Sequence, residues 1–372
     1  MGKKVLLAMS GGVDSSVCAK LLLEQGFEVL GVFMRTGVHP GHGDRPERKK
    51  GCCSALDAND ARRVADRFDI PFHALDFEAE FSKIMDYFAL EYLAGRTPNP
   101  CVVCNNWLKF GQLWSHGQML GVDYIATGHY ARIEHADGEP RLLRAVDPDK
   151  DQSYVLHGLN KEVLDKTLFP LGGMKKEQVR KIAAEAGLAV ASKPDSVEIC
   201  FVPDGDHARM VKQRFPGKSA PGNIVDEQGA VLASHDGIEK FTIGQRKGLG
   251  FSAGERRYVL NILPGENQVV VGERQGLLAQ GLLAEKVNWL AAFPQEENIT
   301  CQIQIRYRHQ AAKGEVRRFS DGRVEAYFAE AQPAVTPGQA AVFYQGDQVL
   351  GGGWIVKPIR RASLTQEKAA LA

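Results

Sequence analysis

A glycine-containing loop near the start of the chain has the residue types of an anion-binding site. It reads Ser-Gly-Gly-Val-Asp-Ser-Ser from Ser10 to Ser16, between a short apolar run and a stretch with helical spacing. Glycines let the backbone approach an anion closely, and the first amides of a helix point toward it. We therefore predict a nucleotide phosphate site at the following residues: Ala8, Met9, Ser10, Gly11, Gly12, Val13, Asp14, Ser15 and Ser16.

Within this loop, Asp14 suits a different task. A carboxylate does not bind phosphate directly, but it can hold a Mg²⁺ ion that does. The Gly-Lys-Ser/Thr ending of a Walker A loop is absent. A simpler interpretation is a capped helix in which Ser and Asp serve only as caps. The full string, placed directly after a strand, favours the phosphate site.

Two further residues are candidates for the nucleotide site. Gly128 follows the apolar run from Val122 to Ala126. Ligands of doubly wound sheets bind beyond the carboxyl ends of the strands, so Gly128 is placed for close approach. Met34 ends another apolar run, and its side chain either packs on adenine or belongs to the core.

The chain has seven cysteines, an odd number that does not suggest a secreted disulfide framework. An odd number fits a reducing cytoplasm, where the cysteines that matter for function are reactive thiols or metal ligands. Cys104 immediately precedes a predicted helix from Asn105, and a helix N-terminus lowers the pKa of a thiol. Cys200 lies in a turn-rich stretch able to move. Cys18 and Cys301 are interpreted as core residues.

The elements that must position these residues change character along the chain. Up to about residue 190, apolar runs alternate with helical periods, which indicates a parallel sheet with helical crossovers. After about residue 205, short alternating runs with Gly and Pro indicate antiparallel strands in small barrels or sandwiches. The predicted helices are 14–25, 55–68, 78–94, 105–120 and 175–186, and the predicted strands are 4–9, 27–34, 71–77, 122–127, 258–263, 267–271, 301–307, 324–328 and 340–344.

Chain length, net charge and the length of the apolar runs limit the possible domain count, partners and location. A length of 372 residues favours two or three domains. The formal net charge of +1 means that a nucleic acid would have to be held by local basic patches. No apolar run approaches the roughly 18 residues of a membrane span, and the start of the chain lacks the core of a signal peptide. We expect a cytoplasmic protein with no membrane partner.

Two segments narrow the interpretation to a family. Gly95 to Asn105 reads GRTPNPCVVCN, and Lys193 to Phe201 reads KPDSVEICF. With the first loop, these segments resemble the PP-loop ATP pyrophosphatases and, among them, the tRNA-specific 2-thiouridylases. The resemblance runs nearly end to end through YIATGHY (124–130), DKDQSY (149–154), FTIGQRKGLG (241–250), IRYR (305–308) and TPGQAAVFY (336–344).

The resemblance implies an ATP-dependent 2-thiolation of the wobble uridine of tRNA. ATP, with Mg²⁺, adenylates the C2 oxygen, and sulfur then displaces AMP. The cysteine matching Cys200 receives a persulfide from a donor protein, either a cysteine desulfurase or a relay protein. The cysteine matching Cys104 resolves the transfer by forming a disulfide with it. The implied domains are a PP-loop domain with a parallel doubly wound sheet (1–205), a small central β-rich domain (206–275) and a C-terminal antiparallel β-barrel that binds tRNA (276–360).

The resemblance also implies contacts with the tRNA. The target base would meet Asn99, Pro100 and Cys101, and other nucleotides would meet Lys150, Asp151, Gln152, Arg306 and Tyr307. Amide and cationic groups suit base edges and phosphates, and a cation beside an aromatic ring suits phosphate binding with stacking. The plainer interpretation of these residues is a solvated charged surface, which we also expect for Lys175-Lys176, Arg180-Lys181 and Arg317-Arg318.

One departure from the family pattern affects the mechanism. Many members carry Asp where this chain has Cys101, so the proton-transfer role of that Asp is unassigned here. Cys101, Cys104 and Cys200 could instead hold an iron–sulfur cluster with one open iron, and a Cys101–Cys104 disulfide could compete with the Cys104–Cys200 pair. A PP-loop ligase acting on small molecules and a non-catalytic RNA-binding module are competing interpretations of the whole chain. Cys52 and Cys53 follow a polar loop from Thr36 to Gly51; they could be a redox or metal accessory, and their role stays unassigned.

Overall fold

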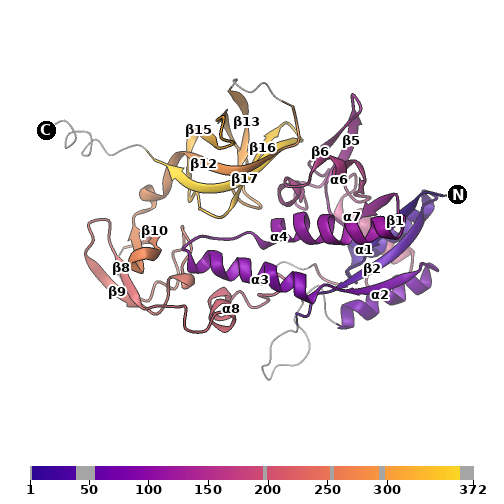
Figure 1. Cartoon of the computed structure of the whole chain (residues 1–372), viewed down its shortest axis with the longest axis horizontal. Coiled ribbons are helices and arrows are strands. Elements are labelled where there is room, and N and C mark those ends of the chain that lie inside the picture. Colours follow the sequence, from indigo (N-terminus) through magenta and orange to yellow (C-terminus); the bar gives the residue numbers. More distant parts are fainter. Residues whose placement is uncertain (1, 39–54, 196–198, 252–254, 293–297, 361–372) are drawn as a thin grey trace. The chain divides into compact units, whose positions relative to one another are not determined.

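The computed structural model describes residues 2–38, 55–195, 199–251, 255–292 and 298–360 (Figure 1). Cys52, Cys53, most of the predicted polar loop and the last dozen residues lie outside these ranges. Contacts divide the chain into two units. The first comprises Met1–Asp86, Pro100–Asp206 and Asp347–Val349, and the second comprises Tyr87–Asn99, His207–Gly346 and Leu350–Ala372.

The first unit contains a five-stranded sheet in the order β3-β2-β1-β4-β7, with every neighbouring pair parallel. The order runs outward in both directions from β1, so the sheet is doubly wound and its switch point lies between β1 and β4. The predicted parallel α/β domain is confirmed. Its strands are β1 (Lys4–Ala8), β2 (Glu28–Arg35), β3 (Phe72–Asp76), β4 (Tyr124–Ala126) and β7 (Thr167–Leu168).

Helices cover both faces of this sheet. On one face α1 (Val13–Glu24) packs against α7 (Lys176–Glu185), and both join the core of β1 and β2 with α2 (Ala55–Arg67). On the other face, a methyl group on Gly117 of α5 (Trp114–Met119) would lie 3.1 Å from Leu6. Val5, Leu6 and Leu7 are therefore fully buried, and β1 reads as a continuous apolar run rather than an alternating one.

The helix that carries Cys104 differs from its prediction. We predicted a start at Asn105, but the helix begins at Pro100 with α4 (Pro100–Val103). It continues as a π-helical segment, η1 (Cys104–Leu113), before α5 completes it. Proline is favoured at the first helical position because its fixed φ suits the helix and its missing N–H has no partner there. The wider π-helical turn is unusual over this length and is frequent at functional sites.

The remaining elements of the first unit lie around the sheet. β5 and β6 form a hairpin, and Asn160 caps α6 by accepting a hydrogen bond from the amide of Val163 (2.8 Å). Among the described residues, no helix is long and apolar enough to cross a membrane. The bounds are α3 (Glu78–Leu93), which ends in the second unit, β5 (Arg132–Ala136), β6 (Glu139–Leu143), η2 (Ser153–Leu156) and α6 (Lys161–Asp165).

The second unit begins with a small sheet in the order β10-β11-β8-β9. We predicted antiparallel strands here, but β11 and β8 are parallel. The long connection between them, through β9 and β10, gives room for the crossover that a parallel pair requires. The elements are α8 (His207–Arg214), β8 (Gly222–Val225), β9 (Val231–His235), η3 (Ile238–Lys240), β10 (Tyr258–Leu263), η4 (Pro264–Glu266), β11 (Gln268–Gly272) and η5 (Arg274–Leu277).

The second unit also contains a closed antiparallel barrel. Its strands follow the order β12-β15-β14-β13-β16-β17, and β12 pairs with β17 to close it. Alternate side chains fill the interior, among them Ile303, Phe343 and Cys301. The predicted C-terminal barrel is confirmed. Its strands are β12 (Leu278–Trp289), β13 (Ile299–Gln304), β14 (Ala312–Arg318), β15 (Val324–Pro333), β16 (Ala340–Gln345) and β17 (Gln348–Ile359).

Candidate nucleotide and sulfur site

The switch point of the parallel sheet brings two predicted site segments together. The loop from Ser10 follows β1, and Thr127-Gly128 follows the neighbouring strand β4. A Cβ on Gly128 would lie 3.0 Å from the backbone nitrogen of Ser15, so a side chain there would press on the loop. This is the edge where ligands of doubly wound sheets bind. The predicted pairing of the loop with Gly128 therefore has a direct geometric basis.

The loop backbone is held in one conformation without a side-chain cap. Gly11 has φ +70°, and a Cβ there would come within 2.1 Å of the carbonyl oxygen of Asp57. The Ser10 amide donates to Ser15 Oγ (3.1 Å), and Ser16 Oγ donates to the Gly12 carbonyl (2.8 Å). Within the described residues, α1 has no side-chain cap at its N-terminus. The capped-helix interpretation is therefore wrong, and the first-turn amides suit an anion.

Not every predicted residue can face a nucleotide with its side chain. Met9 and Val13 are buried in the core, so only their backbone groups are available. Met34 is half-buried near the carboxyl end of β2, which leaves both of its predicted interpretations open. His129 is buried, and its Nδ1 lies 2.7 Å from Thr127 Oγ1. Burial, with a smaller effect of Lys109, holds the pKa of His129 well below its usual value, so this ring is neutral.

Lys176 is a site residue that the sequence did not reveal. We expected Lys175-Lys176 to be a solvated surface, but Lys176 is only 8% exposed. Its Nζ donates to Asp14 Oδ1 (2.7 Å) and Oδ2 (2.8 Å), and Tyr130 donates to Asp14 Oδ1 (2.8 Å). The residue is the first of α7, and only the packing of α7 on α1 turns it inward. It places a buried positive charge beside the predicted phosphate loop.

Asp195 joins this site to the segment that carries Cys200. Its carboxylate pairs with Lys150 (2.7 Å), Lys176 (2.9 Å) and Arg180 (2.9 Å). Burial alone would raise its pKa, but hydrogen bonds from Lys150 and Lys176 hold the pKa at about 2. Arg180, which we expected on a solvated face, therefore has a defined partner. Asp195 is charged at neutral pH and anchors the start of the segment leading to Cys200.

Lys193 fixes the phosphate loop from the other side. Its Nζ donates to the Gly11 carbonyl (2.8 Å), to Asp57 Oδ1 (2.7 Å) and to Asp60 Oδ2 (2.7 Å). The loop, α2 and the Cys200-bearing segment are thus tied at one ammonium group. Lys193 belongs to the KPDSVEICF motif, so its position could be predicted from the resemblance, although its partners could not.

The predicted tRNA-contacting residues Asp151 and Gln152 make contacts within the first unit. Asp151 accepts hydrogen bonds from Arg144 (2.9 Å) and Ser153 Oγ (2.9 Å), and Gln152 Oε1 accepts from the Tyr130 amide (2.9 Å). Gln152 is thereby linked to Asp14, because the hydroxyl of the same Tyr130 donates to the Asp14 carboxylate. The prediction that this stretch contacts tRNA stays a prediction.

The three candidate sulfur residues all belong to the first unit, and all are thiols. Cys101 is exposed, whereas Cys104 and Cys200 are half-buried. Because the helix begins at Pro100, Cys104 is not at its N-terminus, and the expected reason for a reactive thiol there is wrong. The first turn instead carries Cys101.

The other two described cysteines are core residues, as predicted. Cys18 is fully buried in α1, and Cys301 is 6% exposed in β13. Burial raises the pKa of Cys18 well above its usual value and raises the pKa of Cys301 to about 12. Both thiols stay protonated near neutral pH, which makes them poor nucleophiles.

The remaining predicted contact residues differ in accessibility. Asn99 and Pro100 are buried, and the chain just before them is held by Gln339, which donates to the carbonyls of Thr97 and Pro98 (3.1 Å each). Arg306 and Tyr307 are exposed. We predicted a strand to Tyr307, but β13 ends at Gln304, so both residues lie in the following loop. Their accessibility is compatible with an RNA contact.

Within the described ranges, no three His, Cys, Asp or Glu side chains gather into a group able to hold a metal ion. Cys101, Cys104 and Cys200 all lie in those ranges. The iron–sulfur interpretation therefore lacks a preformed ligand group in this conformation. The described side chains around Asp14 likewise do not form a Mg²⁺ site by themselves.

Comparison with known proteins gives matches over most of the chain. Three family models match in succession: the tRNA methyl transferase HUP domain over residues 3–204, the tRNA methyl transferase PRC-barrel domain over 209–273 and the aminomethyltransferase beta-barrel domain over 279–355. A tRNA-specific 2-thiouridylase MnmA of Geotalea uraniireducens is 51% identical over 356 residues, covering 95% of both chains. The proteins of that name from Carboxydothermus hydrogenoformans (50% identical, covering 95% of this chain and 98% of the relative) and Clostridium botulinum (46%, covering 96% and 100%) match as fully.

Proposed function

Because the chain belongs to the tRNA-specific 2-thiouridylase family, as its motifs predicted, we propose that it uses ATP to replace the C2 oxygen of a tRNA uridine by sulfur. The observation that carries the proposal is that one structural unit contains both the candidate phosphate loop and the two candidate sulfur-carrying cysteines. The loop from Ser10 to Ser16 meets Gly128 at the switch point, and the same unit carries Cys104 and Cys200. The wobble uridine is the target that the resemblance implies.

The geometry of the loop supports ATP as the energy source. A side chain at Gly11 would clash with the Asp57 carbonyl, and one at Gly128 would press on the loop at Ser15, so these glycines let the loop close up against α2 and the end of β4. The first amides of α1 point beyond β1. Lys176, paired with Asp14, holds an ammonium group beside the loop. Mg²⁺ is commonly held by one or two carboxylates together with substrate phosphates, so Asp14 is the residue that would bind it. The ion would neutralise phosphate charge.

The chemistry needs an activated oxygen and a sulfur nucleophile. The C2 oxygen attacks the α-phosphorus of ATP, forms an O–P bond and releases pyrophosphate. The terminal sulfur of a persulfide on Cys200 then attacks C2, and AMP leaves with the original oxygen. Finally the Cys104 thiolate attacks the Cys200 sulfur, which forms a Cys104–Cys200 disulfide and leaves the second sulfur on C2. A cellular reductant must return the disulfide to two thiols.

The sulfur relay requires a partner that delivers the persulfide, and we propose a cysteine desulfurase or a relay protein in that role. The odd number of seven cysteines supports a reducing cytoplasm as the place of reaction. The tRNA would be held in part by the exposed Arg306 and Tyr307. Its uridine would have to leave the base stack to reach the thiols.

Two competing mechanisms differ in the cysteines that they require. An iron–sulfur enzyme would need Cys101, Cys104 and Cys200 as ligands, and the described conformation does not group them for a metal ion. A small-molecule ligase would need neither Cys104 nor Cys200. The relatives aligned over 95% of the chain are named as thiouridylases, which favours the sulfurtransferase.

Reconstitution of the reaction tests the proposed function. Purified chain, unmodified tRNA, ATP, Mg²⁺ and a cysteine desulfurase with cysteine are expected to give 2-thiouridine, detected in nuclease digests by mass spectrometry. AMP should appear with each thiolated nucleoside, and omission of ATP should stop the reaction. Formation of AMP only with a small amine acceptor, without tRNA, would instead identify the ligase.

A further inference from the structure

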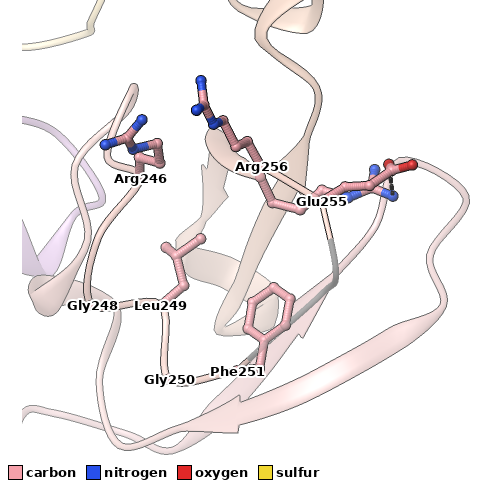
Figure 2. A pocket seen from close by; sticks show the side chains of 8 residues that line it. Arg246, Gly248, Leu249, Gly250, Phe251, Glu255 and Arg256 are labelled. Atoms are coloured by element: carbon pink, nitrogen blue, oxygen red, sulfur yellow. Dashed lines mark ion pairs between the residues drawn. The ribbon is translucent and has the colours of Figure 1, made fainter.

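The second unit contains a cavity of about 690 Å³ that the sulfur chemistry does not use. Its lining residues lie between Arg246 and Phe251 and between Glu255 and Arg257, two short segments that both precede β10. Figure 2 shows Arg246 and Arg256 directing their guanidinium groups to the same side of the cavity, with Leu249 and Phe251 beneath them. The lining is thus cationic above and apolar below.

The wall from Arg246 to Phe251 is held in place before any ligand binds. Gly248 and Gly250 both have left-handed φ values, +75° and +81°, and they bracket Leu249, which is 8% exposed in the core of this unit. Gln245 clamps the loop by accepting from the Thr242 amide and donating to the Lys247 carbonyl (3.0 Å each). A preformed wall loses little conformational freedom when it binds.

The cavity carries uncompensated positive charge. Arg246 and Arg256 are exposed, and neither has an ion pair within the described part of the chain. Arg257 lies 3.7 Å from Glu255, a contact that neutralises that arginine in part. By contrast, a cavity of the first unit lined by Arg132 and Arg144 has its charge cancelled by Asp347 and Asp151. The cavity of the second unit therefore favours an anion.

Phe251 narrows the class of anion. Its ring lines the cavity and is only half-buried against the core, so one part remains accessible. Guanidinium groups bind phosphate oxygens through paired N–H donors, and an aromatic ring provides a stacking surface for a base. A phosphate site beside a stacking surface matches two of the parts of a nucleotide.

We propose that this cavity binds one nucleotide of the substrate tRNA, its backbone phosphate on Arg246 and Arg256 and its base against Phe251. The inference rests on the proposed function, because that function makes tRNA the substrate. It adds a second contact region to Arg306 and Tyr307, in the small sheet rather than in the barrel.

Salt dependence of tRNA binding separates the phosphate contact from other effects. Each phosphate contact contributes about one unit to the slope of log K against log salt, and the two arginines share one phosphate, so the double variant Arg246→Gln/Arg256→Gln should lower the slope by about one. Its affinity should fall roughly tenfold near physiological salt. Arg274→Gln, an exposed arginine of the same unit outside the cavity, is the matched control and should leave both the affinity and the slope unchanged.

Phe251→Leu tests the base contact with a side chain of similar bulk. It should weaken tRNA binding while leaving the salt slope unchanged, because stacking releases no counterions. An unchanged slope in the arginine variant overturns the inference, as does tight binding of AMP or inorganic phosphate at this cavity with unaltered tRNA affinity. If the wild-type chain thiolates tRNA and the variants bind like it, this inference alone fails. A wild-type chain that neither binds nor thiolates tRNA would refute the proposed function.

Discussion

Replacement of either Cys104 or Cys200 by serine is expected to lower 2-thiouridine formation by at least roughly a thousandfold. A serine hydroxyl cannot carry a persulfide, and it cannot resolve one by forming a disulfide. Both variants should still bind ATP and release pyrophosphate, because the phosphate loop holds none of the three candidate sulfur residues. Mass spectrometry of tRNA digests measures the thiolation, and pyrophosphate release measures the first half-reaction.

Two companion variants make this result interpretable. Cys301→Ala removes a buried thiol of the barrel core and should thiolate tRNA normally once folded. Cys101→Ser distinguishes two mechanisms: retained activity supports the two-thiol relay, and loss equal to that of Cys104→Ser supports three cysteines acting together. Appreciable thiolation by either Cys104→Ser or Cys200→Ser would rule out the relay.

Replacement of Lys176 by methionine is expected to weaken ATP binding by roughly a hundredfold, the range of one charge-assisted hydrogen bond. The variant removes the ammonium group 2.7 Å from Asp14 and leaves that carboxylate to repel an incoming phosphate. Isothermal calorimetry with a non-hydrolysable ATP analogue measures the change. Thermal unfolding should confirm that the variant folds, since Asp195 keeps Lys150 and Arg180 as partners.

Lys181→Met provides the matched control for this prediction. Lys181 lies in the same helix, its side chain is 77% exposed, and its partner Glu185 is 3.8 Å away. Exposed pairs of this kind contribute little. The control should bind ATP as the wild type does. Equal affinities in both variants would show that Lys176 serves the fold of the apo chain and has no part in nucleotide binding.

Local pattern was sufficient for much of the fold. The continuous apolar run of β1, buried on both faces, and the alternating runs of the barrel strands follow directly from how each sheet is covered. The Cys104 helix begins at Pro100, five residues before its predicted start, and proline suits a first helical position. The parallel pairing of β8 with β11 depends on contacts between distant segments, which no local pattern specifies.

In the candidate site, too, the residues fixed by local pattern could be predicted, and those fixed by contacts between distant segments could not. Gly11 and Gly128 could be predicted because each lies directly after a strand of the sheet, and the order of elements places both at one edge. Lys176 and the partners of Asp195 could not, because a lysine at a helix start reads as surface until the packing of that helix is known. The roles of Cys104 and Cys200 came from family motifs rather than from any local physical signal.

The most direct measurement follows the oxygen that sulfur replaces. A tRNA carrying ¹⁸O at C2 of its target uridine, incubated with the chain, ATP and a persulfide donor, should yield 2-thiouridine and AMP. Adenylation of that oxygen predicts one ¹⁸O atom in the phosphate of AMP for each sulfur gained. Recovery of the label in water, or sulfur incorporation with unlabelled AMP, would contradict the account.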